Sequence, residues 1–445
     1  MRGGPDADLR FCETLELPAG LPAPDLDDPG QVALVRACHL TFGISYYKAA
    51  LPGRIVFDPP AYGTLDAAEV EFYDRLYSEG LGEFHFRNGL SVPDGAGFAA
   101  AAAMSAAAAQ SATGAPGADR IDADLPAPKT PHAGSLVLIG GGKDSGLVAE
   151  LVRASGEPAA ALALGNSPWM ERSAAAAGLT LHRIGRQIDP ALLALNARGA
   201  WNGHVPISAC IAAVSTLVAR AAGFRDVLVG NERGADDANL QWQGRAVNHQ
   251  WSKSSRFERS FQQLCQRTVG PWPRYASLLR PLSEIRIAAA FARCTAQHDQ
   301  FTSCNRNFRL DPRQRPQRWC TTCAKCVFVA LILTPHLTDQ QRDAIFGADL
   351  LAAPENRTHL LALLALADVK PWDCVGTARE CWLSLLTLAR QQRLPAGLLD
   401  LLAHTPADLQ GAGFAEAWQD EWQVRASPLL PPEWQERLHA YLGAD

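Results

Sequence analysis

Short apolar runs alternate with amphipathic stretches through the middle of the chain. The apolar runs have the length of β-strands and lie at residues 135–139, 159–164, 180–184 and 226–230. The stretches between them carry apolar residues at helical spacing and lie at 144–155, 168–178, 188–198 and 207–222. Short apolar strands separated by helices are typical of a parallel sheet that is buried on both faces. We therefore predict an α/β fold with a doubly wound parallel sheet, whose ligands bind at the carboxyl ends of the strands.

The segments on either side of this region have different patterns. Residues 31–52 begin as a helix and then become irregular, and residues 65–84 carry a helical stripe of large apolar side chains. The stretch that follows is mostly Ala, Gly, Pro, Ser and Asp, which is typical of a linker, and the end of the chain is helical in pattern. The predicted division is a smaller N-terminal domain suited to substrate recognition, a linker, an α/β domain and a helical C-terminal domain, at residues 1–94, 95–134, 135–345 and 346–445.

The composition is that of an ordinary globular protein, with 47% hydrophobic and 20% charged residues. The formal net charge of −5 argues against a protein that coats nucleic acid or an anionic membrane. The sequence has no apolar stretch of the roughly 20 residues that a membrane span requires, and its start lacks the apolar core of a signal peptide. We therefore expect a cytoplasmic protein without nucleic-acid or membrane partners.

A glycine-rich loop follows the first apolar run. Gly140, Gly141 and Gly142 allow a tight turn and let the backbone approach a ligand closely. The helix that begins next offers unpaired N–H groups and a positive dipole end, which suit a phosphate group. Lys143 adds a cation to this loop and Ser145 adds a hydroxyl. The loop is therefore a candidate phosphate-binding site.

Asp144 lies in the same loop, where a carboxylate alone would repel a phosphate. It fits there only where Mg²⁺ bridges the carboxylate and the phosphate. The spacing of the loop matches neither the Walker motif nor G-x-G-x-x-G. The alternative interpretation is a tight turn between strand and helix without a ligand.

Four cysteines are clustered with the spacing C-x15-C-x2-C-x2-C, at Cys304, Cys320, Cys323 and Cys326. Four thiolates at this spacing can close a tetrahedral Zn²⁺ site with no open position, so we expect structural zinc. The length of the chain and the missing signal peptide favour a reducing compartment over a disulfide framework. An iron–sulfur cluster, a disulfide pair and free thiols are the alternatives.

Glu232 and Arg233 follow the fourth apolar run, where the predicted sheet binds its ligands. Either they face a substrate or they form a structural ion pair. Residues 247–254 combine an amide, an imidazole, an indole, hydroxyls and an amine, which a plain surface loop rarely does. This segment contributes His249 and Lys253 as candidate functional residues.

His204 precedes the helix expected at 207–222. A lone histidine at a helix entrance is more often structural than catalytic. The sequence therefore gives this residue a weaker claim to a functional role than it gives the polar segment at 247–254.

Two family resemblances follow from these motifs. GGGKDS at 140–145 resembles the SGGxDS pyrophosphate loop of the PP-loop ATP pyrophosphatases, in which a serine stands at the position of Gly140. A wider set of segments, between about residues 40 and 376, is similar to the ATP-dependent UDP-N-acetylmuramoyl-L-alanyl-L-glutamate epimerases called MurL. These segments are SYYKAA (45–50), GLGEFHFRNGL (80–90), NGHVPI (202–207), GNERGAD (230–236), VNHQWSKS (247–254), LLRPLSEI (278–285), SCNRNFR (303–309), WCTTCAKC (319–326) and KPWDCVG (370–376).

The resemblance implies a fold of the PP-loop, adenine nucleotide alpha hydrolase-like kind. It also implies a bacterial cytoplasmic enzyme of peptidoglycan synthesis that inverts the terminal L-glutamate of UDP-MurNAc-L-Ala-L-Glu. The implied reaction consumes ATP with Mg²⁺, passes through an acyl-adenylate and releases AMP and pyrophosphate. By the same resemblance residues 140–143 and Ser145 bind pyrophosphate and Asp144 holds Mg²⁺. The enzymes that make 7-cyano-7-deazaguanine carry a similar cysteine arrangement, which supports zinc by analogy.

The proton-transfer residues do not follow from the resemblance. His249 and Lys253 are the leading candidates, with His204 behind them, and Glu232 and Arg233 are expected to contact substrate or metal. Cysteine bases are known in amino-acid racemisation, so Cys210 and Cys374 stay open as alternatives.

Three rival functions fit parts of the pattern. The first is a PP-loop amide-forming enzyme or amidotransferase, which would need a nitrogen donor for turnover. The second is a tRNA-modifying enzyme, which the net charge of −5 does not favour. The third is a zinc-ribbon interaction module, which the intact glycine loop argues against.

Overall fold

The structure is a computed structural model that describes residues 9–52, 55–56, 65–103, 133–309 and 311–443. Within these residues a six-stranded sheet has the order β1-β4-β3-β2-β5-β8, and a separate ribbon consists of β6 and β7. The strands are β1 (Thr14–Glu16), β2 (Ser135–Leu138), β3 (Ala159–Leu164), β4 (Leu181–Gln187), β5 (Asp226–Val229), β6 (Leu240–Trp242), β7 (Arg245–Val247) and β8 (Arg274–Ser277). The four predicted apolar runs correspond to β2, β3, β4 and β5.

The central sheet is mostly parallel. β2 pairs with β3 in parallel register, with Ser135 opposite Ala159, whereas β1 is antiparallel to β4 at one edge. The backbone N–H groups of Arg274 and Leu278 donate to the carbonyls of Arg225 and Val229, so β8 advances in the same direction as β5. The chain moves outward from β2 to β4 on one side and then from β5 to β8 on the other. The strand order therefore reverses between β2 and β5.

Two compact units divide the chain, and neither is continuous in sequence. Unit 1 consists of residues 1–134, 184–227 and 241–275, and unit 2 of residues 135–183, 228–240 and 276–445. One boundary between the units lies directly before β2, and the other four fall inside β4, β5, β6 and β8. The division predicted at residues 94, 134 and 345 stays a prediction, and most of its linker, 104–132, lies outside the described residues.

Helices make up much of both units. Unit 1 contains α1 (Pro29–Ala50), α3 (Ala67–Ser78), α4 (Gly82–Arg87), α8 (Pro190–Ala197), α9 (Ile207–Ala222) and α10 (Ser255–Thr268). Unit 2 contains α6 (Lys143–Ala154), α7 (Pro168–Ala176), α11 (Glu284–Ala292), α12 (Ala324–Leu333), α13 (Asp339–Phe346), α14 (Arg357–Leu363), α15 (Ala378–Arg390), α16 (Gly413–Trp422) and α17 (Pro432–Gly443). No helix in the described part of the chain is both long and apolar enough to cross a membrane.

In unit 1, α1 packs against α3, α8, α9 and α10. The expectation that residues 31–52 end irregularly is wrong, because α1 stays helical to Ala50. The helical stripe of α3 buries Tyr73 and Tyr77, and the ring of Phe98 packs against both, with centroids 5.5 and 4.9 Å away. Phe98 belongs to the segment expected as a linker, so the described part of that segment is held by aromatic packing.

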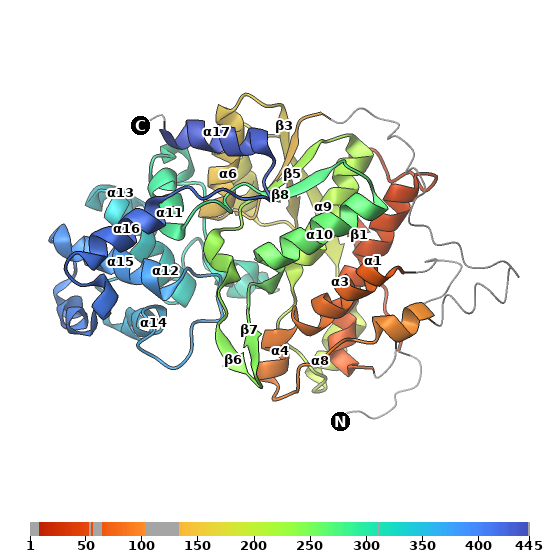
Figure 1. Cartoon of the computed structure of the whole chain (residues 1–445), viewed down its shortest axis with the longest axis horizontal. Helices are drawn as coiled ribbons and strands as arrows, with labels where there is room; N and C mark the ends of the chain where they lie inside the picture. The colour runs from red at the N-terminus through yellow and green to blue at the C-terminus, as the bar shows by residue number, and fades with distance from the viewer. Residues whose placement is uncertain (1–8, 53–54, 57–64, 104–132, 310, 444–445) are drawn as a thin grey trace, which may run out of the picture. The chain divides into compact units, whose positions relative to one another are not determined.

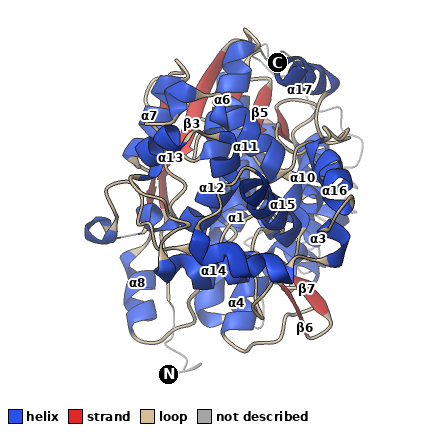
Figure 2. Cartoon of the chain, turned by 90° about the vertical axis from the view of Figure 1, so that its left-hand side faces the viewer, coloured by secondary structure: helices blue, strands red, loops and turns tan. Residues whose placement is uncertain are grey.

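The hydrophobic core of unit 2 surrounds α12. Every residue of this helix is buried, as expected for a helix that is apolar on all sides. It packs against α11, α14 and α15, which Figure 2 shows around it. Buried side chains of β2, β3 and α6 belong to the same cluster. This core supports the loops at the carboxyl ends of β2 and β3.

The first turn of α1 depends on a buried ion pair in unit 1. Asp28 caps the helix by accepting from the N–H of Gly30 (2.9 Å), and Arg220 Nε donates to its other oxygen (3.0 Å). Burial by itself raises the pKa of Asp28, but Arg220 and Gln31 outweigh it and the pKa is lowered. The contribution of Asp28 to stability is therefore complete above its ordinary pKa and is lost as the pH falls through the lowered value.

We expect Asp28→Ala to reduce the free energy of unfolding by about 3 kcal/mol, because it removes a helix cap and leaves Arg220 buried without a carboxylate. The exposed neighbour Asp27 provides the control, and Asp27→Ala should change stability by no more than about 0.5 kcal/mol. Urea unfolding followed by circular dichroism measures both variants. Equal midpoints for the two variants would contradict the importance of the pair.

Candidate functional site

The glycine loop follows β2 and ends at the first residue of α6. Gly141 has φ +81°, and a Cβ there would lie 2.9 Å from the backbone carbon of Trp169, so glycine is required. Gly142 precedes α6 without a side-chain cap, and its carbonyl accepts from the hydroxyl of Ser145 (3.1 Å). A Cβ at Gly140 would meet nothing within 4 Å, so the loop has open space beside that residue.

Lys143 lies inside unit 2, where its side chain is fully buried. Its ammonium contacts the carboxylates of Asp144 and Glu284. Burial by itself lowers the pKa of Lys143, but the two carboxylates outweigh it and raise the pKa. The ammonium predicted to meet pyrophosphate thus has two carboxylate partners from the chain itself.

The acidic groups around Lys143 exceed the basic ones. Burial and the carboxylates of Asp144 and Glu232 raise the pKa of Glu284 to about 8, against the opposing charges of Lys143 and Lys325. A buried group of carboxylates with too little positive charge favours the uptake of a cation. The carboxylates around Lys143 therefore carry a surplus of negative charge beside the glycine loop.

The loop after β5 adjoins the glycine loop. A Cβ at Gly230 would lie 3.1 Å from the backbone carbonyl of Asp144, so a larger residue there would push the two loops slightly apart. Ser277 in β8 fixes the backbone of Asn231, because the backbone N–H of Asn231 donates to the hydroxyl of Ser277 (2.8 Å). The two loops meet where the strand order reverses, the position at which α/β sheets bind their ligands.

Several buried polar atoms near these loops have no hydrogen-bond partner among the described residues. They are Nδ2 of Asn231, Nη1 of Arg233 and Oγ of Ser167, which follows β3. Buried donors are nearly always satisfied in a finished site, so these three indicate room for a ligand rich in oxygen. Asn231 and Ser167 were not predicted from the sequence, because an asparagine or a serine in a loop carries no spacing signal.

Both interpretations of Glu232 and Arg233 find partial support. The guanidinium of Arg233 forms an ion pair with Glu421 in α16, while its Nη1 has no partner among the described residues. Glu232 is buried, and its backbone carbonyl accepts from Arg280 (2.6 Å). Glu232 and Arg233 are therefore both held by contacts with other residues of unit 2. Both lie in the loop after β5, which adjoins the glycine loop.

The four predicted cysteines come together at the start of α12. Their sulfur atoms all lie within 4.8 Å of one another, and Cys326 Sγ is 3.5 Å from Cys323 Sγ and 3.8 Å from Cys320 Sγ. Four sulfurs at 2.3 Å from one tetrahedral ion are about 3.8 Å apart, which matches this spacing. None of the four cysteines forms a disulfide in this structure. A multi-iron cluster would divide the four thiolates among two or more irons and hold those on different irons farther apart, so the geometry favours a single ion.

A second polar cluster lies in unit 1 and contains two predicted residues, His204 and His249. His249 Nδ1 is 2.5 Å from Oε2 of Glu83 in α4, and His204 Nδ1 is 3.3 Å from the same oxygen. The two imidazole rings are 4.6 Å apart and tilted by 53°. Figure 1 shows α4 beside β7, which leads into the loop that carries His249. The sequence analysis missed Glu83, although it lies in the motif at 80–90.

Glu83 and His204 differ in their charge near pH 7. Burial by itself raises the pKa of Glu83, but the hydrogen bond and charge of His249 and the charges of His204 and Arg87 outweigh it, so the pKa is lowered. Burial is also the main cause that lowers the pKa of His204 to about 3. The charges of His249, Lys48 and Arg87 act in the same direction, and Glu83 opposes them. The carboxylate is therefore ionised and His204 is neutral near pH 7.

The remaining predicted bases occupy different surroundings. Lys253 is half-buried at the end of the 3-10 helix Trp251–Lys253. Cys210 is fully buried in α9, where its thiol donates to the carbonyl of Thr41, and burial raises its pKa to about 12. A thiol with this pKa stays protonated near neutral pH, so Cys210 is a poor base. Cys374 is half-buried, and its carbonyl accepts from Lys325.

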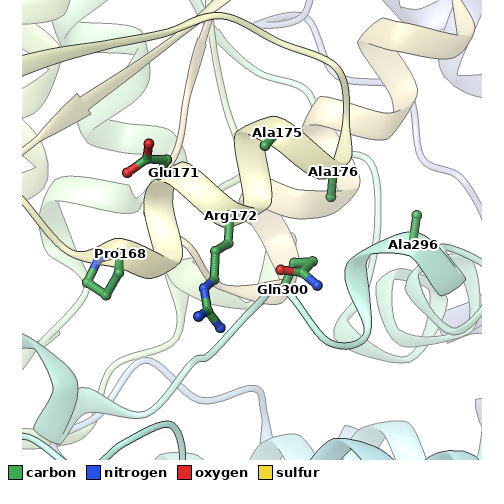
Figure 3. A pocket seen from close by; sticks show the side chains of 7 residues that line it. All are labelled: Pro168, Glu171, Arg172, Ala175, Ala176, Ala296 and Gln300. Atoms are coloured by element: carbon green, nitrogen blue, oxygen red, sulfur yellow. The ribbon is translucent and has the colours of Figure 1, made fainter.

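A cavity of about 540 Å³ lies against α7 (Figure 3). Arg172 and Gln300 point toward the same space, and Glu171 points away from it. The lining residues are Pro168, Glu171, Arg172, Ala175, Ala176, Ala296 and Gln300. Since none of the predicted site residues lines it, this cavity is not the candidate site.

Comparison with known proteins identifies the class. Three similar proteins are each named UDP-N-acetyl-alpha-D-muramoyl-L-alanyl-L-glutamate epimerase. The one from Xanthomonas oryzae pv. oryzae is 39% identical over 79% of this chain and 73% of its own length. Those from Salinispora tropica and a Micromonospora species are 35% identical, over 87% and 98% of this chain and 80% and 92% of their own lengths. The chain is therefore an enzyme of the isomerase class.

Two family models cover most of the chain. Residues 4–278 match the MurL N-terminal domain, and residues 300–408 match the MurL C-terminal domain. The chain belongs to the MurL family, as the sequence motifs predict.

We expect Lys143→Met to reduce the free energy of unfolding by about 3 kcal/mol in the absence of nucleotide, because it leaves the buried Glu284 and the half-buried Asp144 without their cation. Adding Glu284→Gln should restore at least about 1 kcal/mol, since it removes one uncompensated charge. Urea unfolding of the single and double variants measures this coupling. If Lys143 served only as a phosphate ligand, the single variant would be as stable as the wild type.

We expect one zinc ion per chain, held by Cys304, Cys320, Cys323 and Cys326. Cys323→Ser should lower the zinc content and the melting temperature, because a closed metal site contributes directly to folding. The exposed Cys12 gives a matched control, and Cys12→Ser should leave both unchanged. Elemental analysis of native protein without stoichiometric zinc would contradict this assignment.

Proposed function

We propose that the enzyme epimerises the terminal L-glutamate of UDP-N-acetylmuramoyl-L-alanyl-L-glutamate to D-glutamate in peptidoglycan synthesis, with consumption of ATP. The observation that carries this proposal is the name shared by three relatives at 35–39% identity, which specifies the substrate. We further propose that the sheet and its glycine loop form a PP-loop ATP-binding fold. The reversal of strand order beside that loop supports this assignment.

The residues beside the glycine loop fit a nucleotide triphosphate with Mg²⁺. Open space beside Gly140 and the unpaired donors of Asn231, Arg233 and Ser167 suit phosphate oxygens. The acidic group around Lys143 suits a divalent cation, and Asp144 is its most exposed member, at 24% for the side chain. Mg²⁺ bound there would neutralise phosphate charge and favour departure of pyrophosphate. Lys143 then keeps the acidic groups in place instead of contacting the phosphates.

Activation of the substrate explains why an epimerase would consume ATP. The α-hydrogen beside an ionised carboxylate is a very weak acid, because deprotonation adds a second negative charge to the same group. An acyl-adenylate removes the first charge and withdraws electrons from the α-carbon. A base can then abstract the α-proton, and a proton returns from the other face. Hydrolysis of the adenylate releases the epimer and AMP.

We assign separate proposed roles to the residues of the two units. In unit 2, residues 140–145 bind and orient the nucleotide, while Glu232 and Arg233 contact substrate or metal. In unit 1, His249 and His204 are the proposed proton-transfer residues, since they lie together on one ionised carboxylate. Lys253 is the alternative to His204, because it is close to His249 in the chain.

Incubation with UDP-MurNAc-L-Ala-L-Glu, ATP and Mg²⁺ in D₂O tests the proposal. We expect D-glutamate with deuterium at the α position, pyrophosphate in the medium and no need for a nitrogen donor. A requirement for ammonia or glutamine would instead favour the amide-forming alternative. Deuterium exchange at the full rate without nucleotide would contradict activation by adenylation.

We expect Asp144→Asn to abolish pyrophosphate release, deuterium exchange and inversion together, because all three require the metal-bound nucleotide. Asp236→Asn is a matched control, since Asp236 is a carboxylate in the loop region after β5 and has no assigned role here. It should retain all three activities. Near-normal turnover of Asp144→Asn at saturating ATP and Mg²⁺ would remove Asp144 from the proposed metal site.

A further inference from the structure

A segment rich in arginine lies between the first and the second of the clustered cysteines in unit 2. Residues 305–319, the arginine loop, contain five arginines and one aspartate, and the structure describes all of them except residue 310. The aspartate, Asp311, forms an ion pair with Arg313 (3.0 Å). The loop therefore carries more positive charge than its own carboxylate can neutralise, and none of the roles proposed so far uses it.

Both ends of the arginine loop are fixed beside the glycine loop. The backbone N–H of Thr302 donates to the carbonyl of Gly141 (2.8 Å), and the backbone N–H of Lys143 donates to the hydroxyl of Ser303 (3.3 Å). The end of the loop returns to the same place, because the hydroxyl of Thr302 donates to the carbonyl of Arg318 (2.8 Å). The arginine loop thus begins and ends next to the proposed nucleotide site.

Three arginines of this loop have open donors. Arg306 donates to the hydroxyl of Thr322 (3.1 Å), and Arg309 donates to the side-chain oxygen of Gln314 (3.4 Å). Arg315 donates to the carbonyl of Arg309 (2.7 Å). Within the described residues, each of these three side chains makes one hydrogen bond and no ion pair. Since a guanidinium has five N–H donors, most of their donors are available to a ligand.

The 3-10 turn Asn305–Phe308 presents an aromatic ring beside these arginines. In a 3-10 helix, side chains three residues apart lie on the same side, so Arg306 and Arg309 share one side of the turn. Asn307 is buried, and Phe308 and Arg309 are exposed, with 45% of Phe308 accessible. The turn therefore directs Asn307 inward and offers an apolar ring and guanidinium groups on its outer sides.

This combination of groups suits a nucleoside diphosphate. Guanidinium groups bind phosphate through paired N–H donors, which gives both strength and a defined orientation. An exposed aromatic ring provides a face on which a nucleobase stacks. A simple carboxylate ligand would use the arginines and leave the ring without a function.

We propose that the arginine loop binds the uridine diphosphate group of the substrate, with Arg306, Arg309 and Arg315 on the diphosphate and Phe308 against the uracil. This inference rests on the proposed function, whose substrate carries that group at the end opposite the glutamate. The loop is then the part of unit 2 that selects a UDP-linked dipeptide over a free one.

The diphosphate of the substrate fits this position better than the phosphates of ATP. The glycine loop and the open donors beside it already suit the phosphates of ATP. The glutamate to be activated must lie beside that nucleotide, and the dipeptide, which extends about 7 Å, the lactyl group and the sugar separate it from the UDP group. Arg309 lies six residues after Ser303, a stretch that spans up to about 20 Å, so the loop is long enough to reach the distant diphosphate.

Calorimetric titration with UDP and UMP tests the site without turnover. α,β-Methylene-ATP is present throughout, so that UDP does not bind at the glycine loop. Wild-type enzyme should bind UDP about tenfold more tightly than UMP, because the second phosphate adds charged hydrogen bonds. Arg306→Gln and Arg309→Gln should each weaken UDP binding about tenfold and keep UMP binding within about threefold, so that the preference for the diphosphate is lost.

Arg313→Gln is the matched control for charge. It removes one cation from the same loop, but Arg313 is already held by Asp311 through Nε and Nη2, both at 3.0 Å. Affinity for UDP should stay within about threefold of wild type. Because Asp311 is then left without its partner, a general effect of charge on UDP binding would be largest in this variant.

Variants of Phe308 test the aromatic face. Phe308→Ala should weaken UDP binding about fivefold or more, the usual effect of losing a stacked base, and Phe308→Tyr should bind within about twofold of wild type. Thermal melting and zinc content verify that the variants fold, which is expected because the ring and the guanidinium of Arg309 are exposed.

Three results would overturn the arginine loop as the site for UDP. The first is UDP affinity within about twofold of wild type in both Arg306→Gln and Arg309→Gln. The second is an equal loss of affinity in Arg313→Gln. The third is weaker binding of α,β-methylene-ATP with unchanged binding of UDP, because the arginines would then serve ATP.

Turnover separates this inference from the proposed function. A wild-type enzyme without ATP-dependent inversion would refute the proposed function, whatever the titrations show. With an active wild type, Arg309→Gln should raise the KM for UDP-MurNAc-L-Ala-L-Glu about tenfold and keep kcat and the KM for ATP within about twofold. Turnover of MurNAc-L-Ala-L-Glu, which lacks the UDP group, should not change. An active wild type whose KM for the full substrate is unaffected by Arg309→Gln would overturn the inference alone.

Discussion

The buried ammonium of Lys143 is the interaction on which the arrangement of unit 2 depends. Through Glu284 it links the start of α6 to the start of α11. The backbone N–H of Glu284 donates to Glu380 (2.6 Å), and Glu380 also closes the capping box of α15 with Thr377. Removal of the Lys143 ammonium would leave the neighbouring carboxylates with too little positive charge and in mutual repulsion. The glycine loop is thus fixed by a charge network beneath it, which leaves its backbone available to a ligand.

The cluster around Glu83 in unit 1 also has an excess of charge, but there the excess is positive. One carboxylate, Glu83, is surrounded by Arg87, Lys48 and two imidazoles. Since a single anion cannot neutralise all of these groups, the imidazole of His204 stays uncharged. The same shortage of negative charge favours an anionic ligand near the imidazoles. Both units therefore keep an uncompensated charge at their candidate sites, where a fully neutralised cluster would have no affinity for an ion or a proton.

The sequence predicted those features whose signal is local. The apolar runs located β2, β3, β4 and β5, and the cysteine spacing identified a cluster that the structure brings together. β8 was missed because its sequence, RYAS, lacks an apolar pattern, although three of its four residues are buried. Glu83 was missed because its contact with His249 spans 166 residues, and nothing in the local sequence marks such a partner. The burial of Lys143 was also beyond the sequence, since Glu284 lies 141 residues away.

Opposite environments are what the two halves of an activated epimerisation require. Departure of pyrophosphate needs positive charge beside the phosphates, and an excess of buried carboxylate around Lys143 attracts the cation that supplies it. Abstraction of an α-proton needs an uncharged base, and burial together with the cations around His204 keeps that imidazole neutral. One shared cluster could not meet these demands, because carboxylates that attract a metal ion would also hold a proton on a nearby imidazole. Separate clusters of opposite charge excess avoid this conflict, and this is the physical reason for our proposal that activation takes place in unit 2 and proton transfer in unit 1.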